Sequence, residues 1–429
     1  MEILVVLGSL LVLFALGVPI AYALGLAALA GALWIGIPPE AVMLQVSSGV
    51  SKFAMLTIPF FVLAGAIMAE GGMARRLVAL ADALVGMLRI RGGLSVVNVL
   101  ATTFLSGISG SSVADTSAIG SVMIPQMERV GYPRVFATNV TITASVQAIL
   151  VPPSHNAVIY SLATGGSISI ISLFMAGVVP GLLLGAAIIV LCLVIAYRDG
   201  HPAGQPVPPR VALKMAVEAL WGLVTLVIIL GGILAGVFTA IEAGAVACLY
   251  AFLVTMFVYR DYRWRDLPLL IHRTVRTVAM VMTLIAFAAS VGYVMALMQI
   301  PARVTSFFLT LSSDKHVILM MLNLLLLVLA CVVDMAPLIL ICTPILLPVV
   351  THLGVDPVHF GMIMLLNLGI GLCHPPVGSI MFVGCAVGGV TMEQVMRTIW
   401  PFYGAMFAVL MLVTYVPEIS LWLPRALGL

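Results

Sequence analysis

Continuous apolar runs, each ended by a short polar or charged segment, make up most of this 429-residue chain. In residues 182–196 and 322–333 the apolar residues follow one another without the alternation of a membrane-spanning β-strand. A helix needs roughly 20 apolar residues to cross the hydrocarbon core of a bilayer, and many of the runs approach that length. The pattern therefore predicts an all-α polytopic membrane protein.

The first apolar run, residues 3–35, is too long for a cleaved signal peptide and lacks a basic start. We expect it to form the first membrane segment, entering from a cytoplasmic N-terminus and ending at Pro38 and Pro39. Residues 75–87 and 267–278 combine apolar positions with flanking charge, which is typical of helices that lie on the membrane surface.

The polar, proline-rich segment 197–213 separates two halves that resemble each other. Markers recur in the same order in both halves, each 223 positions after its counterpart: Pro125 and Pro348, Gly131 and Gly354, Pro152 and Pro375, Pro153 and Pro376, Gly165 and Gly388. This register predicts a first repeat at 1–196, a cytoplasmic linker at 197–213 and a second repeat at 214–429.

The basic residues predict that the two repeats face opposite ways. With a cytoplasmic N-terminus, fifteen of the 19 basic residues fall on the cytoplasmic side, and the outer side holds Lys52, Arg303, Lys315 and Arg425. Equivalent segments differ: 75–91 is basic, whereas its counterpart near 303–315 is sparse in charge. Inverted repeats are typical of secondary transporters with a binding site near the middle of the membrane.

A cluster of Ser, Gly and Asp at 105–120 interrupts the apolar sequence. Gly and Ser favour turns and caps, and irregular backbone at membrane depth must be buried or line a cavity. The apolar arms on either side are too short to span, so we predict a re-entrant helical hairpin at 94–130 with its tip at 109–112. The alternative is a small-residue packing motif between helices.

Two double-proline motifs, at 151–156 and 374–379, lie in the middle of apolar segments. Consecutive prolines break a helix, and broken helices at matching positions of two repeats are a pointer to a transport site. We predict broken helices at 134–162 and 357–387. Freed carbonyls together with Ser154, Asn156 and Ser379 would suit a hard cation such as Na⁺. Two ordinary proline kinks are the alternative.

Asp334 lies where a second hairpin, at 316–350, should have its tip. A carboxylate inside the membrane is costly unless it faces a cavity or a partner, so Asp334 is a candidate ligand for a cation or for solute. A cap on the following helix is the other interpretation. We also expect Asp115 to cap the second arm of the first hairpin, Glu242 to support a helix start, and His374 to be a core residue.

Composition excludes several classes of function. The chain is 63% hydrophobic and only 8% charged, against about 25% charged residues in soluble domains. Its basic residues lie in short clusters without interleaved aromatic residues, so we expect no nucleic-acid partner. The six cysteines lie inside apolar runs without metal-ligand spacing, and no nucleophile–base pair, phosphate-binding loop or dinucleotide fingerprint occurs, so we expect no enzyme.

Six segments, in this order, resemble one known family. They are IPFFVLAGAIMAEGG (58–72), LSGISGSSVADTSAIG (105–120), VPPSHN (151–156), GVFTAIEAGAV (236–246), Asp334 with its following proline, and GLCHPPVG (371–378). Together they are similar to the large membrane subunit, the DctM type, of tripartite ATP-independent periplasmic (TRAP) transporters.

The resemblance implies an elevator-type transporter in which two hairpins and two broken helices move against a scaffold. It implies two partners, a small four-helix membrane subunit and a periplasmic solute-binding protein, and an organic acid as solute. It also implies no cofactor, and Na⁺ as the coupling ion. Carried over, one Na⁺ would lie between Ser109, Gly110, Ser112 and the break at Ser154–Asn156, and a second between Asp334 and Gly378–Ser379. Ser111, Ser154 and Asp334 would lie near the solute. The site region has no arginine, although many organic-acid carriers use one.

We therefore expect a subunit of the bacterial inner membrane, embedded in the lipid bilayer, that imports a small carboxylate driven by a Na⁺ gradient. A stand-alone Na⁺/anion symporter is the closest alternative. An intramembrane enzyme would need a catalytic dyad or clustered carboxylates, and a passive channel would not need broken helices in inverted repeats.

Overall fold

The computed structural model describes residues 2–87, 90–203, 207–375 and 378–429. Throughout these ranges the regular elements are helices, and the only β-type pairing is an isolated bridge between Arg91 and Ala203. Within the same residues, six helices are long and apolar enough to cross a membrane, or up to nine spans if each of three bent pairs counts as one. The prediction of an all-α polytopic membrane protein is confirmed.

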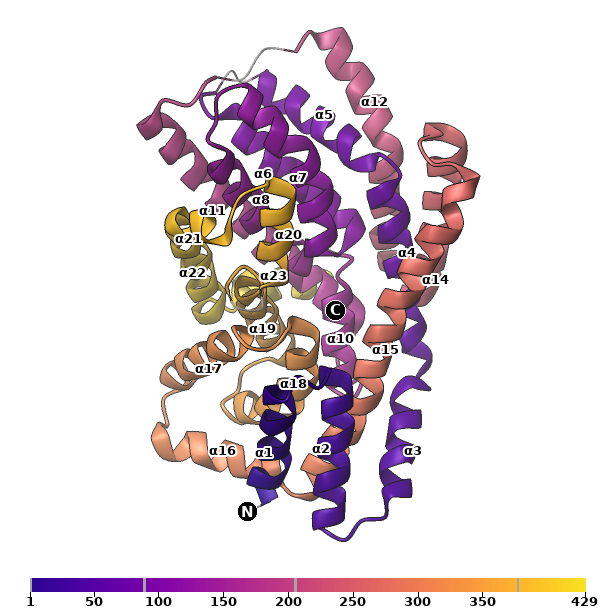
Figure 1. Cartoon of the computed structure of the whole chain (residues 1–429), viewed down its shortest axis with the longest axis vertical. Helices are drawn as coiled ribbons and strands as arrows, with labels where there is room; N and C mark the ends of the chain where they lie inside the picture. Colours follow the sequence, from indigo (N-terminus) through magenta and orange to yellow (C-terminus); the bar gives the residue numbers. More distant parts are fainter. Residues whose placement is uncertain (1, 88–89, 204–206, 376–377) are drawn as a thin grey trace.

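The helices fall into two sets (Figure 1). We call the first set, which precedes the hairpin of each half, the frame helices. They are α1 (Glu2–Ala15), α2 (Ile20–Trp34), α3 (Pro39–Val50), η1 (Phe53–Leu56), α4 (Thr57–Glu70), α5 (Met73–Gly86), α12 (Pro209–Leu226), η2 (Val227–Gly231), α13 (Gly232–Leu234), α14 (Ala240–Leu253), η3 (Val254–Tyr259), η4 (Trp264–Asp266), α15 (Leu267–Leu297) and α16 (Ile300–Leu311).

The second set, which we call the hairpin bundle, follows in each half. In the first half it contains α6 (Gly93–Ser109), α7 (Ser112–Arg129), α8 (Arg134–Ala144), α9 (Gln147–Leu150), α10 (His155–Ala163) and α11 (Ile170–Asp199). In the second half it contains α17 (Lys315–Ala330), α18 (Met335–His352), α19 (Pro357–Gly371), α20 (Ser379–Gly388), α21 (Met392–Thr398), α22 (Trp400–Tyr415) and α23 (Glu418–Ala426).

The first apolar run forms two helices, so the prediction of a single first segment is wrong. α1 and α2 pack side by side and are joined by a turn in which Gly17 has a φ of +74° and Pro19 precedes α2. The N-terminus and the turn at Pro38 consequently lie at the same end of the molecule (Figure 1). A cytoplasmic N-terminus and an outer Pro38, predicted from one crossing, therefore cannot both hold.

The two expected surface helices differ in the structure. α5 is a separate helix packed against α6 and α12, as its range predicted. Residues 267–278, however, are the first third of the uninterrupted α15, so a separate helix there is wrong. No proline follows Pro268 in this stretch, and the charge is accommodated at the helix start because Arg273 pairs with Glu70 on α4 at 3.1 Å.

Helix bounds repeat with the offset seen in the sequence. α7 and α18 begin at Ser112 and Met335 and end at Arg129 and His352, 223 residues apart at both ends. α8 and α19 likewise begin at Arg134 and Pro357. In each half, a helix–turn–helix is followed by a helix interrupted at the proline motif; the first interrupted helix bends by 47°.

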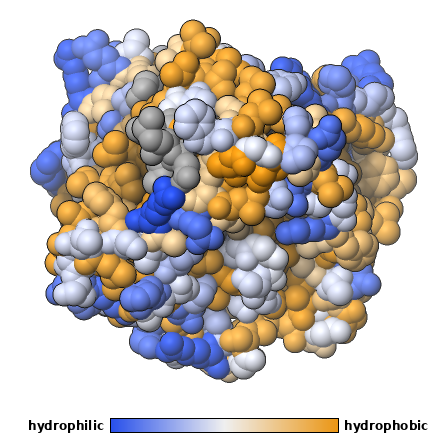
Figure 2. Space-filling model, turned by 90° about the horizontal axis from the view of Figure 1, so that it is seen from below, coloured by the Kyte–Doolittle hydropathy of each residue, from blue (hydrophilic) through white to orange (hydrophobic). Residues whose placement is uncertain are grey.

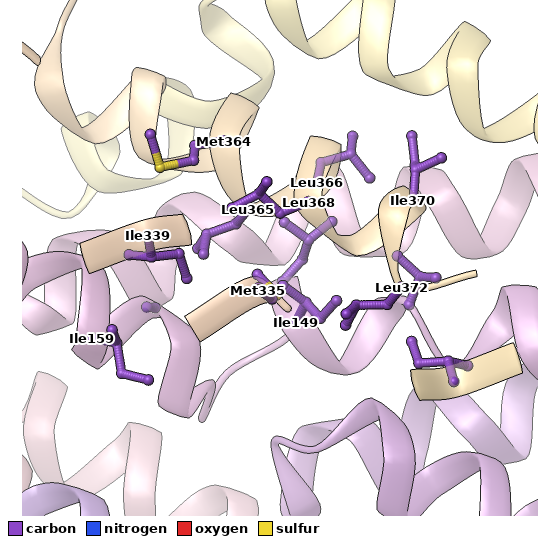
Figure 3. Packing of buried hydrophobic residues seen from close by; sticks show 14 of the residues in the cluster. Ile149, Ile159, Met335, Ile339, Met364, Leu365, Leu366, Leu368, Ile370 and Leu372 are labelled. Atoms are coloured by element: carbon purple, nitrogen blue, oxygen red, sulfur yellow. The ribbon is translucent and has the colours of Figure 1, made fainter. Parts of the chain in front are cut away.

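The second arm of each broken helix packs on the other half of the chain. α20 lies on α7 and α8, where Gly384 faces Ile142, and α10 lies on α18. The first arms cross where Gly369 of α19 meets Val146 and Ile149. Val146 and Gly369 are themselves 223 positions apart, so the crossing joins equivalent positions of the two halves. Figure 3 shows Ile149 there with Met335, Leu368 and Leu372.

Polar and aromatic side chains form a contact network at one end of the molecule. At the end opposite the N-terminus (Figure 1), Asp261 accepts from Arg76, whose guanidinium also lies 3.7 Å from the centre of the Tyr259 ring. At the same end, burial lowers the pKa of His201, which packs against the rings of Tyr132 and Phe136. At the N-terminal end, hydrophilic and hydrophobic residues are interspersed (Figure 2).

Candidate functional site

The first hairpin turns in two residues. α6 ends at Ser109, Gly110 takes a φ of +60°, and Ser111 is the N-cap of α7, its hydroxyl accepting a hydrogen bond from the Ala114 amide at 3.4 Å. Glycine suits this left-handed conformation and serine suits the N-cap, which is why the polar cluster folds as a tip. The tip lies at 109–112, where the sequence predicts it.

Asp115 joins the two arms of this hairpin and does not cap α7 as expected, because Ser111 holds the cap position. The carboxylate is fully buried and accepts hydrogen bonds from the hydroxyls of Ser106, at 2.7 Å, and Ser109. The Ser109 hydroxyl also accepts from the Ser111 amide at 3.2 Å. A buried carboxylate is costly unless it is hydrogen-bonded, so these contacts hold Ser109 in a fixed orientation at the tip.

The first broken helix opens at the double proline. α9 ends at Leu150, and Ser154 is the N-cap of α10, accepting from the Ala157 amide at 3.4 Å. Its hydroxyl also donates to the carbonyl of Ile149 at 2.6 Å, across the break. Gly177 of α11 faces the Leu150 carbonyl at the same level, where any side chain would collide with it. The break is therefore enclosed by protein, as irregular backbone at membrane depth must be.

The first tip and the first break lie against each other. A Cβ at Gly110 would overlap the carbonyl oxygen of Pro153. Next to this contact in the chain, the Ser112 hydroxyl is buried and has no hydrogen-bond partner among the described residues. Carbonyl and hydroxyl oxygens are ligands that hard cations take, so the arrangement provides a cation with several oxygens. Ser109, Gly110, Ser112 and Asn156 all belong to these adjoining segments.

The second tip and break also adjoin. Gly371, the last residue of α19, packs directly on Ala330, the last residue of α17. One residue further, the Cys331 sulfur lies 3.5 Å from Nδ1 of His374. His374 is half-buried between the tip and the break and lines a small pocket with Trp400 and Phe407, so it is not the core residue that we expected. Pro376 and Val377 lie outside the described residues, and so does Arg89, one of the basic residues assigned to the cytoplasmic side.

Asp334 is the N-cap residue of α18, but its side chain makes no capping hydrogen bond. It is half-buried, the backbone amide of Met335 lies within hydrogen-bond reach of its carboxylate, and no ion pair of that carboxylate occurs within the described ranges. Gly378 and Ser379 begin α20 on the far side of the second break. The carboxylate makes no N-cap hydrogen bond, so its other acceptor positions can serve a cation or a solute group.

The three expected solute residues lie at helix N-termini. Ser111, Ser154 and Asp334 begin α7, α10 and α18, and α10 packs against α18. In the part of the chain that the structure describes, no hydrogen bond joins any two of them. Helix N-termini carry partial positive charge, which compensates in part for the missing arginine.

Other contacts at the site were not anticipated from sequence. Gly65 of α4 faces the carbonyl of Ser109, which lets a frame helix touch the first tip. The hydrogen bonds from Ser106 and Ser109 to Asp115 were also missed. All three residues lie within one polar cluster of the sequence, with Ser109 three residues after Ser106 and Asp115 six residues after Ser109. Away from the site, Glu242 forms the expected support of a helix start, a capping box with Thr239.

Comparison with known proteins identifies what this geometry is similar to. Residues 7–419 match the family model of the tripartite ATP-independent periplasmic transporter, DctM component. A C4-dicarboxylate TRAP transporter large permease protein DctM of Rhodobacter capsulatus is 37% identical over 442 residues, covering 100% of both chains. The isethionate TRAP transporter permease protein DctMQ of Oleidesulfovibrio alaskensis is 37% identical over 420 residues, which are 97% of this chain and 66% of that protein.

A solved structure with the same fold is that of the Alcanivorax borkumensis YdaH transporter. It superposes with a TM-score of 0.56 and 15% sequence identity, covering 90% of this chain and 87% of YdaH. At this identity the likeness concerns the fold alone.

Proposed function

Since the chain belongs to the family of TRAP transporter DctM components, we propose that it imports a small organic acid driven by a Na⁺ gradient. Family membership makes it a large permease subunit of a transporter and not an enzyme. The observation that carries the proposal is the contact between each hairpin tip and the broken helix of its own half, Gly110 with Pro153 and Ala330 with Gly371.

Two Na⁺ sites follow from these contacts. The first uses Ser109, Gly110, Ser112 and Asn156, and the partnerless hydroxyl of Ser112 supports it. The second uses Asp334, Gly378 and Ser379, supported by a carboxylate that makes no cap bond. Both sets contain only oxygen ligands, which Na⁺ shares with other hard cations.

The solute is a small carboxylate that contacts Ser111, Ser154 and Asp334. The two relatives are named for C4-dicarboxylates and for isethionate, so small organic anions are the appropriate class. Without an arginine, attraction comes from bound Na⁺, hydroxyl groups and the N-termini of α7, α10 and α18.

The hairpin bundle moves against the frame helices to carry the site across, in the manner of an elevator. The basic end with Arg75, Arg76 and Arg273 faces the cytoplasm of a bacterial inner membrane. This orientation puts the N-terminus on the outer side, since Figure 1 shows it at the other end. The division into inverted repeats at 1–196 and 214–429 belongs to the same proposal.

A small four-helix membrane subunit and a periplasmic solute-binding protein complete the transporter. The relative named DctMQ is longer than this chain, which covers 66% of it, and this leaves room for a fused second component. A stand-alone symporter would instead transport without either partner.

The test is uptake by proteoliposomes that contain this chain with its two partners. We expect radiolabelled C4-dicarboxylate to accumulate when Na⁺ is high outside, and to stop accumulating when choline replaces Na⁺. Accumulation that ignores the Na⁺ gradient would contradict Na⁺ coupling. Equal uptake after omission of the binding protein would favour the stand-alone symporter.

A further inference from the structure

A pocket of about 360 Å³ lies between the frame helices and the hairpin bundle, away from the tips and breaks. Its frame wall comes from α3, α15 and the segment around Lys52. Its bundle wall comes from the C-terminal end of α10 and the middle of α18. Small-molecule sites commonly occupy roughly 300–1,000 Å³, so the pocket can hold a small solute.

The two walls differ in chemistry. The polar and charged side chains, Lys52, Gln45, Ser48 and Tyr293, all belong to the frame wall, which also carries apolar residues such as Met55 and Ile285. The bundle wall carries Leu162, Ala163, Leu340 and Pro344. Lys52 is the one charged residue among those that line the pocket, and no acidic residue lines it within the described part of the chain. An anion that enters therefore meets a positive charge and neutral hydrogen-bonding groups on one side, and apolar surface on the other.

The position of Lys52 results from an interruption in the frame. α3 ends at Val50, Lys52 has an extended backbone with a ψ of 130°, and η1 begins at Phe53. Gly49 allows α3 to approach Ala289 of α15 closely just before this point. The ammonium group is exposed and forms no ion pair or hydrogen bond with any described residue. Lys52 thus lies directly before the candidate membrane span Phe53–Glu70, with its charge free to attract an anion.

We propose that this pocket is a capture site for the carboxylate of the transported solute, with Lys52 as the residue that attracts it. The inference rests on the proposed function, because it takes the transported organic anion as the ligand. The bundle wall connects the pocket to the central site. Leu340 follows Asp334 by six residues, or about 9 Å of helix, and Leu162 follows Ser154 by eight, or about 12 Å.

The geometry gives the captured anion a direction to move. α10 reaches the pocket with its C-terminal end and α18 with its middle, and their N-termini lie at Ser154 and Asp334. A carboxylate held by Lys52 therefore lies beside two helices whose positive ends point at the central site. Because the pocket is bounded by both helix sets, movement of the bundle against the frame changes its shape and releases the anion.

The test compares Lys52→Gln and Lys52→Arg with wild type in the reconstituted transporter, measuring initial uptake across a range of C4-dicarboxylate concentrations. We expect Lys52→Gln to raise KM roughly 5- to 20-fold with kcat changed less than about twofold, since only a ground-state attraction is lost. Lys52→Arg keeps the charge and should stay within about threefold of wild-type KM. Added choline chloride should reduce the difference between wild type and Lys52→Gln, because salt screens exposed charge.

Lys315→Gln is the matched control, since it removes the same charge from the start of α17, outside the pocket. It should leave KM unchanged. An unchanged KM in Lys52→Gln, or an equal rise in Lys315→Gln, would overturn the proposal. Loss of Na⁺ dependence in wild type would contradict the coupling mechanism alone, because KM for the solute can still be compared.

The headgroup of a net-anionic lipid is the other anion that Lys52 could hold. Uptake is therefore measured in liposomes of neutral phosphatidylcholine and again with phosphatidylglycerol added. A solute site gives the same KM ratio between variant and wild type in both; a ratio that disappears in pure phosphatidylcholine would assign Lys52 to lipid and overturn the proposal.

Occupancy is read separately by chemical labelling. Ser48→Cys in a background without the six native cysteines places a thiol in the pocket. We expect C4-dicarboxylate to slow its reaction with a charged maleimide at least threefold, and Lys52→Gln to remove this protection. Protection that persists in Lys52→Gln would contradict a role for the lysine.

Discussion

Ser154 and Asp334 are both N-cap residues, but their side chains make different hydrogen bonds. The Ser154 hydroxyl both donates to Ile149 and accepts from Ala157, so it already holds the first break in shape. Asp334 makes no N-cap hydrogen bond at the start of α18, and its carboxylate is contacted by the adjacent Met335 amide. A cap residue that does not cap gives up about 1 kcal/mol of helix stability, which suggests that its carboxylate serves a ligand.

Asp334→Ala should therefore abolish Na⁺-driven uptake while expression and thermal stability stay near wild type, because the residue contributes no cap bond. Uptake and melting temperature of the purified protein are the measurements. Asp314→Ala is the control: Asp314 caps α17 by accepting from the His316 amide at 2.7 Å, so this variant should lose roughly 1 kcal/mol of stability and keep transport. Wild-type uptake by Asp334→Ala would make the carboxylate structural only.

At the scale of helices and turns, Gly110 is the element boundary on which the first ion site depends. It combines a left-handed backbone with direct contact to the Pro153 carbonyl. The backbone oxygen cannot move aside as the end of a flexible side chain would. Any larger residue must therefore separate the tip from the break.

Gly110→Ala should weaken apparent Na⁺ affinity in uptake at least tenfold, because the oxygens of tip and break no longer converge. Gly131→Ala separates the two causes of strain: its φ is +104°, but no atom lies within 4 Å of the added Cβ. This control should cost about 1 kcal/mol of stability and leave Na⁺ affinity unchanged. Equal losses of Na⁺ affinity in both variants would attribute the effect to backbone strain.

The hairpins and breaks were predictable because the residues that form them act locally. Gly110, Ser111 and the double prolines end helices in almost any surroundings. The turn after α1 was missed because Gly17 and Pro19 lie inside a run that is apolar throughout, and periodicity gives no sign of a reversal. The continuity of α15 was missed because Arg273 and Arg276 suggested a surface helix, whereas Glu70 on α4 provides Arg273 with a partner.

The candidate ligands were likewise visible as residue types, but not their pairing. Nothing in the sequence places the Ser109 hydroxyl against Asp115 or leaves Ser112 without a partner. These depend on how the two arms of the hairpin face each other, which is a property of packing. Lys52 was counted only as an outer charge, because its pocket is formed by four helices distant in sequence.

For the whole molecule, the crossing of the two first arms is the point where both halves meet at equivalent positions. A Cβ at Gly369 would lie 2.7 Å from the Ile149 side chain and 2.9 Å from that of Val146. Both distances are shorter than ordinary van der Waals contact, so the interiors of the two halves tolerate no larger residue without moving apart.

Gly369→Val should lower the free energy of unfolding by roughly 1–3 kcal/mol, because overpacking shifts the first arms of both broken helices. Since both proposed Na⁺ sites lie beside these arms, Na⁺-dependent uptake should also fall. Gly404→Val on α22 is the control, because nothing lies within 4 Å of its Cβ. Melting temperature and Na⁺-dependent uptake are compared in the two variants. A Gly369→Val protein as stable and active as Gly404→Val would show that the two first arms can accommodate a larger side chain, which contradicts the close packing inferred here.

The exchange of second arms between halves has a consequence for biosynthesis. Since α20 covers α7 and α8, and α10 needs α18, the surfaces made first on the ribosome remain uncovered until most of the chain has been synthesised. Until then, we expect the polar hairpin tip and the helix break of the first half to be only partly covered by protein. These contacts predict that the last hundred residues are needed to complete the packing of the first two hundred.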